Sequence, residues 1–64
     1  MIRVNGADRP WRGGTVADLV ADLGLSGRGI AVAIDGEIVA RSRWVATPVA
    51  EGAVVEVVTA AAGG

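Results

Sequence analysis

The sequence predicts a small mixed α+β domain in which one helix covers one sheet. Three observations lead to this class: residues 15–23 carry an apolar stripe at helical spacing, Asn5-Gly6 and Asp35-Gly36 are hairpin-turn pairs between alternating segments, and residues 53–60 are rich in valine. A helix stripe and a sheet face each need an apolar partner, so the two are expected to pack on each other. The expected order along the chain is β-β-α-β-β-β.

The N-terminal segment MIRVNGADRPWR is expected to form a hairpin. Ile2 and Val4 alternate with Arg3, as in a half-buried strand. Asn5-Gly6 then supplies two residues that tolerate positive φ. We expect the second strand at RPWR (residues 9–12), at an edge of the sheet, because Pro10 cannot donate a hydrogen bond to a neighbouring strand.

The segment GGTVADLVADLGL gives the clearest element, a helix of two to three turns. Thr15 is a suitable N-cap, and Asp18 places negative charge in the first turn, where it suits the helix dipole. Gly24 can take the left-handed conformation that ends a helix, and Leu25 is expected to fold back onto it. The apolar stripe consists of residues spaced i, i+3, i+4 and i+7, namely Val16, Leu19, Val20 and Leu23.

The second half of the chain predicts another hairpin and a final strand. Bulky residues alternate with alanines over 30–34, before the Asp35-Gly36 turn. Residues 41–49 show no period, and we expect an irregular crossing there with a 3₁₀ turn near Ser42–Trp44. The last strand is valine-rich on both faces, which favours a central position. The predicted core is Ile2, Val4, Val16, Leu19, Val20, Leu23, Leu25, Ile30, Val32, Ile34, Val55 and Val57.

The composition argues against an enzyme. The 64 residues include no Cys, His, Tyr or Lys, so the chain lacks the usual nucleophiles, neutral-pH bases and metal ligands. The net charge of -1 gives no attraction to nucleic acid or anionic membranes. No apolar run approaches the ~20 residues that span a bilayer, and no signal-peptide pattern is present. We therefore expect a non-catalytic, cytoplasmic protein without a bound cofactor or metal.

One sheet face and the chain end remain as candidate sites. Val54, Glu56 and Val58 point away from Val55 and Val57, so they would form an apolar docking face with one carboxylate. Trp11 or Trp44 could extend that face. Alternatively, the irregular segment or the edge hairpin covers the valines, and Glu56 is simply solvated.

The chain ends in TAAAGG, after a domain that we place at residues 1–59. A terminal segment of small residues can be nothing more than a fraying end. However, Gly63 and Gly64 lack Cβ atoms, so a flexible tail over 60–64 could enter a channel too narrow for side chains. The carboxylate that it would deliver is ionised and unreactive at neutral pH, and it needs a second enzyme to activate it.

Together these segments resemble the ThiS family of sulfur carriers in thiamine (thiazole) biosynthesis. The resemblance rests on NG after the first strand, TVADLVADLGL as the helix, VAIDGEIVARSRW, and EGAVVEVVTAAAGG at the end. It covers nearly the whole chain. The chain departs from the family in having Ala40 and Ala53 where Pro and Asp are usual, and in having Ala-Ala-Ala-Gly-Gly as its tail.

The resemblance implies a β-grasp (ubiquitin-like) fold: a mixed sheet of four to five strands covered by one main helix, with the first and last strands parallel at its centre. It implies that a ThiF-type enzyme uses ATP to adenylate Gly64, which becomes a thiocarboxylate. A donor such as a cysteine desulfurase would supply the sulfur, and thiazole synthase would receive it. Gly63 would keep the tail slim, and the face of Val54, Glu56 and Val58 would dock these partners.

Two alternatives remain open. The same fold and tail would suit a sulfur carrier for another pathway, such as molybdopterin or cysteine synthesis. The domain could also be a plain β-grasp interaction module, or a modifier whose tail is conjugated to amines.

Overall fold

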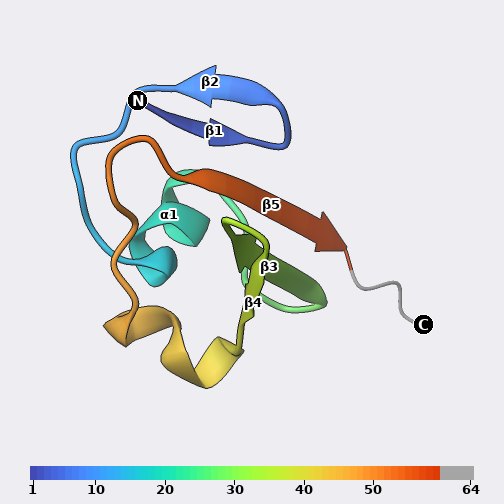
Figure 1. The fold of residues 1–64 in the computed structure, drawn as a ribbon. Coiled ribbons are helices and arrows are strands. Elements are labelled where there is room, and N and C mark those ends of the chain that lie inside the picture. Colours follow the sequence, from blue (N-terminus) through green and yellow to red (C-terminus); the bar gives the residue numbers. More distant parts are fainter. Residues whose placement is uncertain (60–64) are drawn as a thin grey trace.

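Two hairpins, one from each half of the chain, are joined into one sheet by the last strand (Figure 1). The computed structural model describes residues 1–59. The five-stranded sheet has the order β2-β1-β5-β3-β4, and its helices lie on one face. The elements are β1 (Ile2–Val4), β2 (Ala7–Arg9), α1 (Val16–Asp22), β3 (Ile30–Ile34), β4 (Glu37–Val39), the 3₁₀ helix η1 (Arg41–Ala46) and β5 (Val54–Thr59).

The last strand, β5, occupies the centre of the sheet, as the sequence predicts. It runs parallel to β1, with Val4 opposite Val55, and antiparallel to β3, with Val32 opposite Val57. The two hairpins pair antiparallel within themselves. The order of elements matches β-β-α-β-β-β, and the parallel pairing of the first and last strands is confirmed.

Both hairpin turns have two residues in the left-handed region. The φ angles are 51° and 83° at Asn5-Gly6, and 50° and 87° at Asp35-Gly36. Such turns match the right-handed twist of the flanking strands. The predicted position of the second strand, RPWR, is wrong. Because the first turn is only two residues long, Ala7 pairs directly with Val4, and β2 therefore covers Ala7–Arg9. The strand lies at the sheet edge, as expected, and ends before Pro10.

The helix begins and ends with local hydrogen bonds that the sequence encodes. The Asp18 N–H donates to Thr15 Oγ1 at 3.3 Å, and the Thr15 N–H donates to Asp18 Oδ2 at 2.8 Å, which completes a capping box. At the other end Gly24 has a φ of 76°, and the Leu25 N–H donates to the Val20 carbonyl at 3.1 Å. This is the Schellman pattern, so the predicted cap is confirmed.

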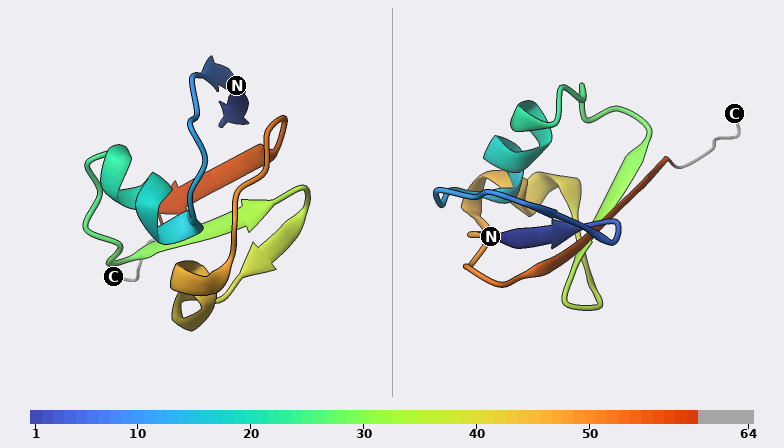
Figure 2. Two further views of the ribbon diagram at one scale, coloured as in Figure 1. Left: turned by 90° about the vertical axis from the view of Figure 1, so that its left-hand side faces the viewer. Right: turned by 90° about the horizontal axis from the view of Figure 1, so that it is seen from above.

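The core lies between the sheet and the helices, and Figure 2 shows α1 and η1 on the same side. Of the predicted core, Leu25 is wrong: after its backbone closes the cap, its side chain is 40% exposed. Leu23, Ile30, Ile34 and Val57 are partly buried. The fully buried members are Ile2, Val4, Val16, Leu19, Val20, Val32 and Val55, joined by three residues that the prediction omitted, Trp44, Val49 and Ala53.

Two of the omitted residues, Trp44 and Val49, belong to the segment without a period, and Ala53 directly precedes β5. The 3₁₀ turn expected near Ser42–Trp44 is present as η1, and it turns Trp44 into the core. The indole Nε1–H of Trp44 donates to the Val39 carbonyl at 3.0 Å, and that of Trp11 donates to the Val49 carbonyl at 2.9 Å. Both rings thus bury apolar surface while their one polar group is paired.

No helix within residues 1–59 is long and apolar enough to cross a membrane.

A pair of leucine substitutions tests this packing. Leu19 is 0% exposed on α1, whereas Leu25 is 40% exposed just beyond it. Leu19→Ala should lower the free energy of unfolding by about 2–5 kcal/mol, because it leaves a cavity in the core. Leu25→Ala should lower it by about 1 kcal/mol or less. Urea unfolding monitored by tryptophan fluorescence measures both; equal losses would contradict the core described above.

Candidate functional site

The side chains of β5 divide between the two faces of the sheet. Val55 is 0% exposed and Val57 is half-buried, and both face the core. Val54 and Val58 are 47% and 57% exposed, and Glu56 between them is also exposed. The alternation follows from the pleat of a strand. The sequence left open whether another segment covers Val54 and Val58. In the structure neither valine is covered.

Neighbouring strands extend this surface. Glu56 lies opposite Ala33 of β3, and Ala33 lies opposite Ile38 of β4. Ala31 pairs in the same way with Val58. Ile38 is the most exposed large apolar residue, at 80%. We call the surface formed by Ala31, Ala33, Ile38, Val54, Glu56 and Val58 the outer face.

The outer face is hollowed where its residues are small. Ala31 and Ala33 lie between the bulkier Ile38 and Val58, and a depression of about 170 Å³ forms there with Glu56 at its side. Sequence analysis missed Ile38. The signal was available, because Ile38 is the only residue of β4 that a two-residue turn places on the face opposite Val39.

The two tryptophans do not extend the outer face, which corrects that expectation. Trp44 is 6% exposed in the core, and Trp11 packs against the core from the segment after β2. Their indole N–H groups bond to carbonyls of residues 39 and 49. The physical reason is that the core beneath the short helix needs large rings to fill it.

One free carboxylate marks the outer face. Within residues 1–59, no cationic group lies at ion-pair distance from Glu56. The nearby pair, Arg3 Nε to Asp8 Oδ1 at 3.2 Å, lies at the β1–β2 end of the sheet, where Arg3 is opposite Val54. The outer face therefore presents apolar side chains around one carboxylate, with the Arg3–Asp8 ion pair beside it at Val54.

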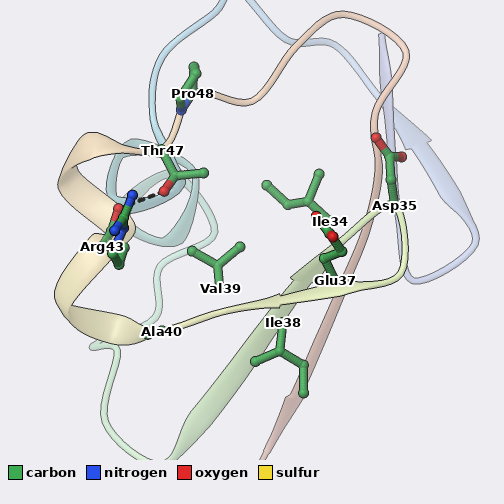
Figure 3. Close-up of a pocket in the computed structure, with 9 residues that line it drawn as sticks. All are labelled: Ile34, Asp35, Glu37, Ile38, Val39, Ala40, Arg43, Thr47 and Pro48. Atoms are coloured by element: carbon green, nitrogen blue, oxygen red, sulfur yellow. Dashed lines mark hydrogen bonds between the residues drawn. The ribbon is translucent and has the colours of Figure 1, made fainter.

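A second hollow, of about 450 Å³, opens between β4 and η1 (Figure 3). Ile34, Val39 and Pro48 contribute apolar walls, while Ile38 points to the other side of its strand. The Thr47 hydroxyl donates to the Arg43 carbonyl at 2.7 Å, and the Asp35 carboxylate accepts from the Val54 N–H at 3.0 Å. The Thr47 hydroxyl and the Asp35 carboxylate are thus engaged in holding the backbone.

The remaining site predictions concern the end of the chain. β5 ends at Thr59. The tail over 60–64, with Gly63 and Gly64, lies outside the described residues. Among residues 1–59, no group of three or more His, Cys, Asp or Glu side chains is placed to hold a metal ion.

The sheet order, the parallel central pair and the single α-helix packed across them define a β-grasp fold. The chain belongs to the ThiS family, whose model matches residues 2–64. The match therefore includes the terminal glycine pair.

Similar solved structures include two from thiamine biosynthesis. The crystal structure of the thiamine biosynthesis protein ThiS from Geobacter metallireducens has a TM-score of 0.85 and 27% identity, covering 98% of this chain and 97% of that chain. An NMR solution structure of a thiamine biosynthesis protein from the same organism has a TM-score of 0.77 and 27% identity, covering 98% and 86%. No curated protein sequence is significantly similar to this chain.

Isosteric substitutions test the division of β5 between core and outer face. The double variant Val54→Thr with Val58→Thr keeps β-branched side chains on exposed positions, so the free energy of unfolding should change by no more than about 0.5 kcal/mol. Val55→Thr places a hydroxyl where the side chain is 0% exposed, and it should cost about 1–3 kcal/mol. Thermal or urea unfolding compares them. A double variant as unstable as Val55→Thr would show that the outer face is covered.

Proposed function

We propose that this chain is a sulfur carrier protein of thiamine biosynthesis that delivers sulfur for the thiazole ring. The observation that carries the proposal is membership of the ThiS family over residues 2–64, a match that reaches the final glycine. The similarity to structures of thiamine biosynthesis proteins supports the pathway. The chemical inventory agrees, because the chain has no Cys or His and is better suited to be a substrate of enzymes than a catalyst.

Gly64 carries the sulfur in this proposal. Its carboxylate attacks ATP within a ThiF-type enzyme, which forms an acyl adenylate and releases pyrophosphate. A sulfur nucleophile then displaces AMP, so that one carboxyl oxygen is replaced by sulfur. The protein itself binds no cofactor, and ATP is used by the activating enzyme. Gly63 lets the backbone approach the reaction centre closely, since it has no side chain.

The outer face docks the partner enzymes. Val54 and Val58 supply apolar contact area, and Glu56 supplies one charge for a basic group. The partners are the ThiF-type adenylating enzyme, thiazole synthase and a sulfur donor such as a cysteine desulfurase; nucleic acid and membranes are not among them. Because one small face serves several enzymes, these enzymes bind in turn and not together.

The intact mass of the protein recovered from cells tests the proposal most directly. A fraction heavier by the difference between sulfur and oxygen, absent when Gly64 is removed, would establish the thiocarboxylate. Incubation with purified thiazole synthase and its small-molecule substrates should then discharge that fraction. If only a molybdopterin or cysteine synthase discharges it, the pathway is wrong. A chain that never acquires sulfur with ATP, the activating enzyme and the donor present is not a carrier.

Deleting Gly64 should abolish adenylation, because the carboxylate then ends one residue short of the reaction centre. Replacing it with valine should have the same effect, since a branched side chain does not fit a narrow channel. Ala60→Ser is the matched control within the tail and should be adenylated normally. Release of pyrophosphate from ATP measures activation, and unfolding curves should be identical for all variants. Normal activation of the deletion variant would contradict the proposal.

The outer-face variants separate docking from chemistry. Val54→Thr with Val58→Thr should raise the KM of adenylation by roughly tenfold while kcat is little changed, because it replaces apolar contact surface with hydroxyl groups but leaves the tail intact. Glu56→Gln, which keeps the shape and removes the charge, should raise KM by a smaller factor that disappears at high salt. A loss confined to kcat would show that these residues do not act in docking.

A further inference from the structure

We infer that Asn5 is a positioning residue that fixes the end of β5 from which the tail leaves the domain. Its side chain forms two hydrogen bonds with Val57, which is 52 residues away in the sequence. Nδ2 donates to the Val57 carbonyl at 3.0 Å, and the Val57 N–H donates to Oδ1 at 2.9 Å. Val57 precedes the end of β5 at Thr59 by two residues.

The side-chain amide of Asn5 replaces the backbone of β1, which no longer pairs with β5 at this point. The backbone of β1 pairs with β5 as far as Val55, whose carbonyl accepts from the Asn5 N–H at 2.9 Å. Beyond that point Asn5 enters the turn with a φ of 51°, so its own carbonyl no longer follows β5. The side chain then reaches the next pair of backbone groups on β5. Without it, the N–H and carbonyl of Val57 on this edge would have no partner from β1.

The other hairpin turn shows why the residue must be an amide. Asp35 occupies the equivalent turn position, with a φ of 50°. Its N–H donates to the Val54 carbonyl at 2.8 Å, and its Oδ1 accepts from the Val54 N–H at 3.0 Å. Here the side chain only has to accept, which a carboxylate does well. At Asn5 the backbone N–H is used at Val55, so the side chain has to donate and accept at once, as only an amide does.

The two turns therefore hold β5 from opposite edges, Asp35 at its first residue and Asn5 near its last. The tail of residues 60–64 follows directly. An activating enzyme that docks on the outer face has to find Gly64 at a set reach from that face. Asn5 keeps this reach constant by holding the last residues of β5 in register with β1. This functional consequence rests on the proposed sulfur-carrier function, whereas the effect on β5 does not.

Amide hydrogen exchange tests the effect on β5 in the full chain. Asn5→Gly preserves the left-handed turn and removes both bonds, so the Val57 amide should exchange roughly tenfold faster. The Val32 amide in the centre of the sheet should change by less than about twofold. A general loss of stability would instead accelerate both equally. Asn5→Asp should also accelerate exchange at Val57, because a carboxylate repels the Val57 carbonyl, while the matched Asp35→Asn should leave Val57 unchanged.

Adenylation kinetics with ATP and a ThiF-type enzyme test the consequence. Asn5→Gly should lower kcat/KM by about fivefold and Asp35→Asn should not, since only the former releases the base of the tail. Wild-type exchange at Val57 in Asn5→Gly would overturn the inference, and faster exchange with unchanged kinetics would overturn its consequence for adenylation. A wild-type chain that is not adenylated would overturn the proposed function, and exchange at Val57 would then decide alone whether Asn5 fixes the end of β5.

Discussion

The fold depends on the insertion of β5 between β1 and β3. The two hairpins do not pair with each other, and β5 joins them into one sheet by pairing with both. It pairs parallel on one side and antiparallel on the other, and Val55, its second residue, is completely buried in the core. Removing these backbone and side-chain contacts would leave each hairpin with a half-covered apolar face, which is marginal in water.

The same six residues also connect the core to the proposed functional surface. Alternate side chains of β5 enter the core or the outer face, and the strand ends where the proposed sulfur-bearing tail begins. A shift of one residue in its pairing would exchange the two sets and bury Glu56. In the proposed function, the register of β5 is thus a requirement for docking as well as for folding. The side chains of Asn5 and Asp35, each in a turn, contribute to it from the two edges.

Sequence reasoning succeeded where the signal is local and periodic. A few adjacent residues are enough to predict the apolar stripe and caps of α1. The same holds for both left-handed turns and for the valine alternation of β5. It failed where the outcome depends on distant parts: Trp44 and Val49 enter the core from an aperiodic segment, and the exposure of Ile38 depends on what covers β4. The position of β2 was missed because a two-residue turn fixes pairing at Ala7, ahead of the more strand-like tryptophan. The hydrogen bonds between Asn5 and Val57 join residues that are 52 positions apart, so no local sequence pattern predicts them.

The place of β5 in the chain also governs how the protein is made. A ribosome releases the N-terminal hairpin, the helix and the second hairpin before the strand that joins them. Until β5 is available, β1 and β3 each have an edge without its partner strand. The complete sheet therefore forms only after all five of its strands have been synthesised. A chain cut short within β5 lacks the strand that joins its hairpins, so it would be exposed to proteolysis.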